Sequence, residues 1–419
     1  MTRQENQALI IGGGVIGVCC MYYLVQRGWD VVLIEKDQIG AGCSYGNAGL
    51  LVPGHSIPLA RPGVIAKGLR WLFNDESPFH IEFRLSPALI SWLIKFRRAS
   101  SNNHMRRSLP VLRDLIIASM ELYRQFLSMS EFDFGYLQNG VLGVYLTKDG
   151  LAEGIEEARL LQEVNVGAEV LDVDATLALE PALRPDVVGS VYYTDDAQIL
   201  PDVFVQKLKC VAENMGARIH VLTEVVGFNV KNRQITSVQT SQGTFYPGLI
   251  VLAAGSWSPI LGQALDLKLP IQPAKGFSVT CQLPVGSPRL PLLLSESRVA
   301  VTPMGNKLRF AGILELVGFD SRINERRVRG MMRSVDHYLA LQDRPAVIET
   351  WSGFRPCTPD GLPIIARSKQ IDNLILATGH GMLGMTLGPI TGLLVSQLAA
   401  RECTMIDFNP FALERFSVF

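Results

Sequence analysis

The stretch that decides the fold is Gln7–Glu35, QALIIGGGVIGVCCMYYLVQRGWDVVLIE. It opens with a short apolar run that is typical of a buried parallel strand. The pattern G-x-G-x-x-G begins at Gly12, and Val15–Arg27 then predicts a helix with Gly28 at the position of a C-terminal cap. A second strand, Asp30–Glu35, ends in a carboxylate. This order of elements predicts a βαβ unit that binds a dinucleotide.

Each part of the unit has a physical role in holding such a ligand. Gly12 permits the tight turn, Gly14 lets the backbone approach a pyrophosphate, and Gly17 lets the helix pack against the strand. The helix N-terminus supplies aligned N–H groups, and Glu35 can accept hydrogen bonds from ribose hydroxyls. A lone glycine pattern would be weak support, because a glycine-rich loop without a ligand has the same composition. The complete order of elements is much stronger.

Both NAD and FAD use this unit, and three later segments favour FAD. The first is Gly40–Gly54, GAGCSYGNAGLLVPG, in which five glycines leave the backbone free to wrap around a ligand. Its polar donors are Cys43, Ser44 and Asn47. The alternative, a flexible surface loop, does not account for the apolar run LLV inside it.

The second segment is Leu249–Trp257, LIVLAAGSW, a buried type of strand that ends in Ala-Ala-Gly. Ligands of a doubly wound sheet lie at the carboxyl ends of its strands, so Ala254 and Gly255 are expected to face the cofactor. Upstream, Ala217–Phe228 is predicted to form one strand, with the backbone of Val225 beside the adenine ring.

The third segment is Asn373–Thr386, NLILATGHGMLGMT, where a strand enters a glycine-rich turn and a helix follows. The N–H groups of Gly384, Met385 and Thr386 are expected to point at the ligand and to stabilise the negative charge of a reduced flavin. His380 has two interpretations. It is either a catalytic base or a turn residue that bonds to the cofactor or the backbone.

Six stretches resemble the FAD-dependent D-amino acid oxidase/glycine oxidase superfamily, and most closely its bacterial D-amino acid dehydrogenase branch. They are IIGGGVIGV, GNAGLLVPGH, PAKGFSVT, LRFAGILELVGF, WSGFRPCTPDGLPII and TGHGMLGMT, in family order between residues 8 and 392. The resemblance implies FAD contacts at Gly12, Gly14, Glu35, Ser44, Asn47, Gly49, Leu50, Val225, Gly255, Gly384, Met385 and Thr386. The wider predicted set adds Val15, Ile16, Gly17, Lys36, Cys43, Ala48, Ala254, Trp257 and Gly381.

The segment Trp351–Ile365 is expected to bind the substrate, since its three prolines restrict the backbone around Arg355. A guanidinium offers two parallel donors to a carboxylate. The family places its carboxylate-binding arginine at the matching position, which favours this role over an ion pair with Asp360. Relatives often add a tyrosine hydroxyl, but the corresponding Leu294–Pro303 has no tyrosine. Arg298 is a weak candidate to assist.

Three other residues are candidate neighbours of the active site. His55 follows the glycine-rich loop and lies either beside the active site or in a cap or turn. Lys275 belongs to PAKGFSVT, a stretch expected to bring a strand near the flavin. Cys357 is either a covalent flavin attachment point or a packed free thiol, and the thiol is the favoured interpretation.

Because FAD segments lie at both ends and in the middle of the chain, we expect an α/β fold with a discontinuous, Rossmann-like FAD-binding domain. An inserted substrate domain is expected to combine helices, including Pro110–Met129, with a mixed or antiparallel sheet built from FSVTCQL, RVAVT and KLRFAGI. The predicted boundaries are 1–56, 187–261 and 350–419 for the FAD-binding domain, and 57–186 and 262–349 for the substrate domain.

Composition narrows the class of partner and compartment. Lys+Arg and Asp+Glu both total 39, so no overall charge favours nucleic acid. The seven cysteines form no Cys-x-x-Cys pair and no cluster with histidine, which predicts reduced thiols, no metal site and a cytoplasmic protein. The N-terminus shows no export signal, and no apolar run is long enough to suggest a transmembrane helix.

The stretch Pro87–Phe96, PALISWLIKF, followed by basic residues to Arg107, has two interpretations. It is either a buried helix with a solvated basic end or a helix on a membrane surface. The resemblance supports peripheral contact with the cytoplasmic face of the inner membrane, because that branch passes electrons to a quinone.

The resemblance implies oxidative deamination of a small D-amino acid, with hydride transfer from Cα to flavin N5. The products would be a 2-oxo acid and ammonia, with a quinone or dye-type electron acceptor. The same motifs fit an oxidase or dehydrogenase of glycine, sarcosine, hydroxyproline or opines. An electron-passing flavoprotein subunit is the alternative from another class.

Overall fold

The computed structural model describes residues 4–71, 79–82, 86–343 and 345–417. The βαβ unit predicted from the glycine pattern is present. Strand β1 (Gln4–Ile11) pairs in parallel with β2 (Asp30–Ile34), and α1 (Val15–Gln26) crosses between them. Gly28 ends α1 with φ +79°, and its N–H donates to the carbonyl of Val25 at 2.9 Å.

Strands from distant parts of the chain extend this pair into one six-stranded sheet. Its order is β19 (Ile364–Arg367), β20 (Leu374–Thr378), β13 (Pro247–Leu252), β1, β2 and β9 (Arg218–His220). All neighbours are parallel except β19 and β20. This arrangement confirms the Rossmann-like α/β fold.

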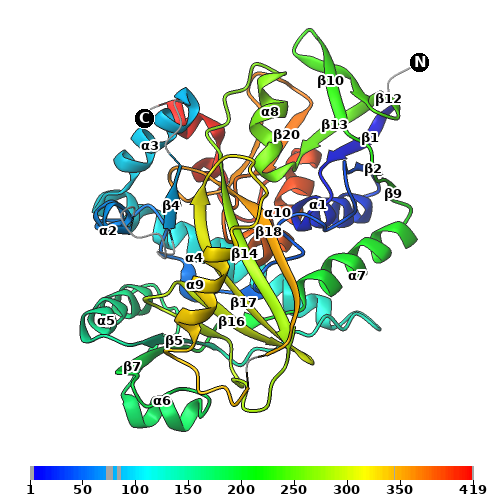
Figure 1. Cartoon of the computed structure of the whole chain (residues 1–419). Coiled ribbons are helices and arrows are strands. Elements are labelled where there is room, and N and C mark those ends of the chain that lie inside the picture. The colour runs from blue at the N-terminus through cyan, green and yellow to red at the C-terminus, as the bar shows by residue number, and fades with distance from the viewer. Residues whose placement is uncertain (1–3, 72–78, 83–85, 344, 418–419) are drawn as a thin grey trace.

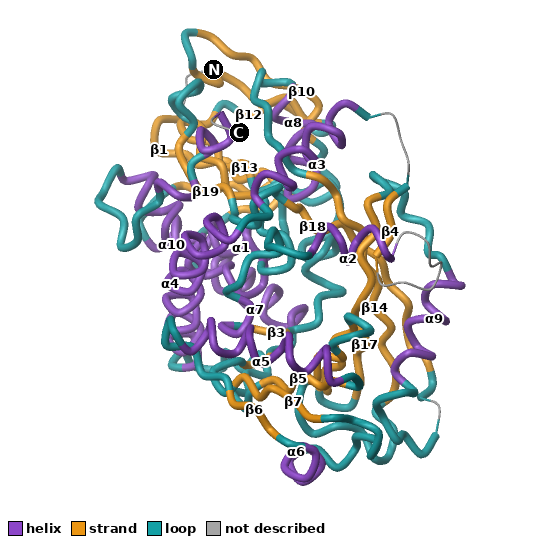
Figure 2. Tube along the Cα trace, turned by 90° about the vertical axis from the view of Figure 1, so that its left-hand side faces the viewer, coloured by secondary structure: helices purple, strands orange, loops and turns teal. Residues whose placement is uncertain are grey.

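Helices cover one face of the sheet, and a small sheet covers the other. On the first face lie α1, α4 (Asn102–Leu127), α7 (Pro201–Asn214) and α10 (Gly384–Ala400), whose apolar side chains form one core with the strands. In Figure 2, α1, α4 and α10 gather on one side of the molecule. On the second face lies a three-stranded sheet of β10 (Val225–Lys231), β11 (Gln234–Thr240) and β12 (Gly243–Phe245).

A nine-stranded sheet forms the other half of the molecule (Figure 1). Its order is β18 (Val347–Cys357), β14 (Gln272–Gln282), β17 (Lys307–Leu316), β16 (Val299–Met304), β15 (Leu292–Leu294), β5 (Val141–Tyr145), β7 (Gly189–Tyr193) and β6 (Glu169–Leu171), with β4 (Phe79–Ile81) beside β17. Only β15–β5 and β17–β4 are parallel among the described pairs of this sheet. The predicted mixed sheet is therefore confirmed.

The remaining elements lie at the edges and between the sheets. They are β3 (Leu50–Leu51), β8 (Ala197–Gln198), α2 (Val64–Trp71), α3 (Pro87–Ala99), α5 (Lys148–Gln162), α6 (Val173–Leu179), α8 (Ser258–Gln263), α9 (Glu325–Val335) and the short 3₁₀ turns Pro53–His55, Gly255–Trp257, Asn409–Phe411 and Leu413–Ser417. None of the helices in the described part of the chain is both long and apolar enough to cross a bilayer.

One local prediction was wrong, and one predicted helix has different bounds. Ala217–Phe228 forms two strands in different sheets rather than one, because Leu222 takes φ +52° and the N–H of Thr223 donates to the carbonyl of Glu35 at 2.8 Å. The helical stretch predicted over Pro110–Met129 is present, within a helix that begins earlier, at Asn102, and ends at Leu127. The hydroxyl of Ser101 caps its start by accepting from the N–H of His104 at 3.3 Å.

The predicted domain boundaries stay a prediction. Sheet membership bears on them at two places, since β7 and β18 hydrogen-bond within the nine-stranded sheet. The boundaries drawn from sequence instead assign residues 187–261, and those from 350 onward, to the FAD-binding domain. We propose that the boundary runs through β18, where the two sheets meet.

Candidate functional site

A cavity of about 1630 Å³ lies between the two sheets, bounded by the loops after β1, β2, β13 and β20 and by β14, β17 and β18. Sites for one small ligand usually measure roughly 300–1,000 Å³, so this cavity has room for a dinucleotide and a substrate together. The predicted cofactor residues that line it are Gly12, Gly14, Val15, Ile16, Glu35, Lys36, Cys43, Ser44, Asn47, Ala48, Leu50, Val225, Ala254, Gly255, Trp257, Gly381, Gly384 and Met385. Gly17, Gly49 and Thr386 are not among the residues that line it.

The glycine loop is built as the pattern requires. Gly12 has φ +112°, and a Cβ there would stand 2.5 Å from the carbonyl oxygen of Ala253, which directly follows β13. A Cβ on Gly17 would overlap the carbonyl of Gly12, so only glycine lets α1 approach β1 this closely. Gly14 differs, because the nearest atom to its Cβ would be the hydroxyl of Ser44 at 3.4 Å. Its face is open toward the cavity.

Two loops bring polar groups to the mouth of this unit. Glu35 accepts from the N–H of Gly13 at 2.7 Å and from the N–H of Asp37 at 2.9 Å, which fixes its carboxylate beside the glycine loop. Ser44 accepts from the N–H of Val15 at 2.9 Å, at the start of α1. Asn47 accepts from the N–H of Gly49 at 2.7 Å, so its NH₂ group remains to donate.

The side chains of Lys36 and Cys43 behave differently from these donors. The ammonium of Lys36 lies 3.7 Å from the ring centroid of Trp257, a cation–π contact that orders both side chains at the cavity edge. Burial raises the pKa of the Cys43 thiol to about 12, so it stays a neutral thiol at physiological pH. The thiol is a poor nucleophile in that state.

The N-terminus of α10 closes the opposite wall. Gly384 and Met385 line the cavity at the first turn of the helix, where the N–H groups have no partners within the helix. Thr386 is buried behind them, and its hydroxyl donates to the carbonyl of Leu50 at 3.3 Å. Tyr123 donates to the carbonyl of Met385 at 2.6 Å and so anchors this turn from α4.

These groups fit FAD. The glycine loop leaves backbone space where a pyrophosphate would lie, and Glu35 offers oxygens to a ribose. The start of α10 would place partial positive charge against the flavin, where it stabilises the anionic reduced form. When bound, FAD would supply the electron acceptor of the reaction, which no amino-acid side chain offers.

Arg355 extends from β18 into the same cavity. One guanidinium nitrogen, Nη1, donates to the carbonyl of Ile313 at 2.9 Å, and the group lies across Gly276, where a Cβ would overlap it. The alternative partner, Asp360, is engaged by Arg415 at 2.7 Å instead. No carboxylate in the described ranges pairs with Arg355, so most of its donors stay available to a ligand anion.

His380 does not have the geometry of a catalytic base. Although it borders the cavity, its ring is buried and its Nε2 lies 3.0 Å from the hydroxyl of Thr391 on α10. Burial lowers the pKa of His380 to about 3, so the imidazole is neutral at physiological pH. The turn-residue interpretation fits this arrangement.

We expect the buried, neutral His380 to make the stability of the protein depend on pH. Its pKa in the folded protein lies below the ordinary 6.5, so the unfolded chain binds the proton more tightly. The contribution of His380 to the free energy of unfolding is therefore fully present above pH 6.5. It is lost progressively as the pH falls toward the folded pKa, and the loss is about 2 kcal/mol near pH 5. We expect His380→Gln to remove this loss. Thermal unfolding of both proteins near pH 8 and pH 5 measures it, and an identical fall in Tm would contradict the assignment.

His55 lines the same cavity. Its Nδ1 is buried without a hydrogen bond among the described residues, and its ring centroid lies 6.5 Å from that of Tyr193. Burial lowers the pKa of His55 to about 4. The structure thus places His55 beside the predicted active site as a neutral ring.

Lys275 lies elsewhere, which corrects its prediction as an active-site neighbour. Its neighbours Ala274 and Gly276 line the cavity, whereas the side chain of Lys275 points to the other face of β14 and borders a separate cavity of about 510 Å³. There its ammonium pairs with Glu315 at 2.9 Å. Because side chains alternate along a strand, a motif that touches the flavin side necessarily sends every second residue away.

The two remaining candidates also line the cavity. Cys357 is buried next to Arg355 and remains a free thiol, and burial raises its pKa to about 11. Arg298 is exposed at the rim, with φ +53°.

Sequence reasoning missed two tyrosines and a tryptophan. Tyr145 on β5 and Tyr193 on β7 are buried and line the cavity, although Leu294–Pro303, which corresponds to the tyrosine-bearing stretch of relatives, has no tyrosine. Trp351 also lines it, and its indole ring covers Gly46 so closely that a Cβ there would overlap the ring. Gly46 and Trp351 are far apart in the sequence, so the packing of the ring on the glycine could not be predicted from the sequence alone.

A dinucleotide loop, a helix start and an arginine facing one cavity define an FAD-binding oxidoreductase. The model of the DAO family, described as FAD dependent oxidoreductase, matches residues 7–398. The chain therefore belongs to the DAO family of FAD-dependent oxidoreductases.

Individual relatives agree with this assignment. The D-amino acid dehydrogenase of Vibrio atlanticus (strain LGP32) is 31% identical and aligns over 98% of this chain and 100% of that protein. The D-amino acid dehydrogenase of Methylobacterium radiotolerans is 32% identical over 98% and 99% of the two chains. Among solved structures, glycine oxidase from Geobacillus kaustophilus has a TM-score of 0.77 at 25% identity and covers 99% of both chains.

Proposed function

We propose that this protein is an FAD-dependent dehydrogenase that deaminates D-amino acids to 2-oxo acids and ammonia. Arg355 carries the proposal, because it is a cation that faces the flavin cavity without a carboxylate partner among the described residues. The relatives named D-amino acid dehydrogenase support the proposed D-configuration and the choice of dehydrogenase over oxidase.

The chain's own residues would act by orientation. Arg355 would bind the substrate carboxylate with two parallel donors and so fix the direction of the Cα–H bond. FAD, when bound, would supply the acceptor for the hydride that leaves Cα. The substrate amine must be neutral at that stage so that its lone pair assists, and the resulting imino acid is hydrolysed by water. His55 is neutral and therefore adds no positive charge to that of Arg355.

Anaerobic bleaching of the bound flavin tests this proposal. We expect the flavin absorbance of the holoenzyme to fall on addition of one or more small D-amino acids, with the L-enantiomers at least about 100-fold slower, since stereochemical rejection costs several kcal/mol. Bleaching by L-amino acids alone would refute the D-configuration. No bleaching by any amine would favour an electron-passing subunit.

Glycine or sarcosine oxidation is the second candidate, and hydroxyproline or opine oxidation shares the same motifs. The likeness to glycine oxidase over nearly the whole chain favours glycine among these. The same panel separates them, because glycine and sarcosine have no chiral Cα. Bleaching by these two and by no D-amino acid would move the assignment to that branch.

We further propose that the electrons pass to a quinone or another acceptor that is not oxygen, at the cytoplasmic surface of the inner membrane. Helix α3 buries Leu89 and Trp92, whereas Ile90 and Ile94 are about half exposed and basic residues end the helix. An apolar strip beside basic residues suits a headgroup surface. Complete solubility after membrane fractionation in low salt would refute this part.

A further inference from the structure

The strand behind Arg355 contains a backbone irregularity. In the register of β14 with β17, Lys275 faces Glu315 and Phe277 faces Gly312, so β17 carries one more residue than β14 in this interval. The extra residue belongs to a β-bulge at Ile313, which has φ +61°. A β-branched residue in the left-handed region is an outlier that the surrounding structure must hold in place.

The bulge determines where Arg355 lies. The carbonyl of Ile313 accepts from Nη1 of Arg355, while the guanidinium rests across Gly276 on β14. One donor is thereby used, and the remaining N–H groups stay free to bind an anion. Without the extra residue, the carbonyl at this position would follow the regular ladder of β17 instead.

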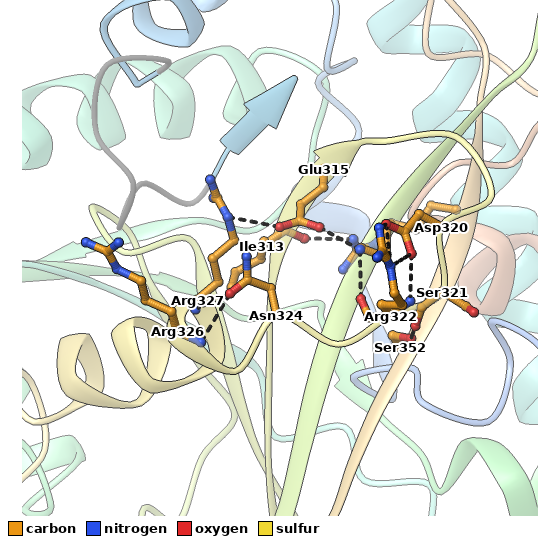
Figure 3. A network of polar contacts seen from close by, with 11 residues as sticks. Ile313, Glu315, Asp320, Ser321, Arg322, Asn324, Arg326, Arg327 and Ser352 are labelled. Atoms are coloured by element: carbon orange, nitrogen blue, oxygen red, sulfur yellow. Dashed lines mark hydrogen bonds and ion pairs between the residues drawn. The ribbon is translucent and has the colours of Figure 1, made fainter. Parts of the chain in front are cut away.

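A buried group of three charges holds the strands directly next to the bulge. Glu315 pairs with Lys275 at 2.9 Å and with Arg327 of α9 at 3.1 Å, and each of these side chains is at most 7% exposed. Figure 3 shows Arg327 reaching Glu315 from the first turn of α9, near Ile313. Asn324 caps that turn by accepting from the N–H of Arg327 at 3.3 Å. The group thus ties β14, β17 and α9 together in one register.

Burying these three charges costs desolvation free energy, so the group is a poor source of stability alone. Well-packed apolar residues often replace buried ion pairs without loss, whereas removing one partner leaves a buried charge. Lys275 also donates to the carbonyl of Arg322 at 3.0 Å, and this hydrogen bond connects the charged group to the loop before α9. The three charges therefore specify one register of the strands behind the cavity.

We propose that Glu315 is a positioning residue for the reaction, because the Lys275–Glu315–Arg327 group locks the bulge at Ile313 that orients Arg355 toward the substrate carboxylate. This inference rests on the proposed role of Arg355. It differs from that role because it assigns the orientation of the arginine to a charge cluster on the opposite face of the sheet.

The test compares Glu315→Gln with wild type, using the best substrate of the bleaching panel, its carboxamide and propionate as a simple carboxylate inhibitor. We expect the KM of the amino acid and the inhibition constant of propionate to rise about tenfold. Flavin content, and the KM of the carboxamide, should stay as in wild type. Glu325→Gln, which removes an exposed carboxylate from α9, the helix that carries Arg327, is the matched control and should change none of these values.

A double-mutant cycle with Arg355→Ala separates positioning from general structure. If Glu315 acts through Arg355, then Glu315→Gln adds no further rise in KM once Arg355 is absent. If the Glu315→Gln variant does not fold, Lys275→Met can replace it in the test. This variant keeps the ion pair between Arg327 and Glu315, whose net charge is zero. It should raise the same KM.

The outcomes are distinguishable. Unchanged constants for the amino acid and propionate in a flavin-loaded Glu315 or Lys275 variant would overturn the inference, as would an equal rise in KM for the carboxamide. An undiminished effect of Glu315→Gln in the Arg355→Ala background would do so too. A normal KM in Arg355→Ala itself would instead overturn the proposed function.

Discussion

Replacing Arg355 with alanine is expected to raise the KM of the amino acid substrate by about 10²–10³-fold, because truncating one partner of a hydrogen-bonded charge pair costs roughly 2–5 kcal/mol. FAD should stay bound, since the hydrogen bond of Arg355 goes to Ile313 and not to the glycine loop. Steady-state kinetics together with the flavin absorbance of the purified protein measure both quantities.

Arg355→Lys is the matched variant, because it keeps the positive charge but loses the planar pair of donors. Its KM should lie between those of wild type and Arg355→Ala. A wild-type KM in flavin-loaded Arg355→Ala would show that the carboxylate binds elsewhere in the cavity.

The second large effect concerns the glycine loop. Gly14→Ala should leave a folded chain, because its Cβ would have 3.4 Å to the nearest atom. Its methyl group would instead enter the space predicted for the pyrophosphate, and the Kd for FAD should rise about 10–100-fold, as overpacking of a tight contact does. Reconstitution of the apoprotein with FAD, followed by flavin fluorescence, measures the Kd.

Gly17→Ala is the informative companion variant. A Cβ there overlaps the carbonyl of Gly12, so the helix and strand must separate, and a loss of soluble folded protein is expected. If both alanine variants had the Tm and the FAD affinity of the wild-type protein, neither glycine would have the role that the pattern assigns to it.

The cofactor half of the site was predictable because its determinants are local. The fingerprint from Gly12 to Gly17, the acid Glu35 and the turn before Gly384 each carry their own strand, turn and helix signals. Each of these features is formed by consecutive residues, so its local structure could be predicted without knowing the tertiary contacts. The fold class followed from their order along the chain.

The substrate half was less predictable because it depends on pairing between distant strands. Lys275 was misplaced because strand parity decides which face a side chain meets, and one residue reverses the answer. Tyr145 reaches the cavity through β5, whose neighbours β15 and β7 are remote in sequence. The partner of His380, Thr391, and the bulge at Ile313 likewise appear only once the elements are packed.

The strand order of the six-stranded sheet has a consequence for biosynthesis. Strands β1 and β2 leave the ribosome first, but β1 needs β13 as its other neighbour, and the cavity needs the start of α10. Until β13 has emerged, β1 keeps an open edge of the kind that invites wrong pairing, and until Gly384–Thr386 have emerged the cavity lacks one wall. Capture of FAD is therefore a late event in the life of the nascent chain, and a prematurely terminated product would hold the recognition loop without the wall that retains the flavin.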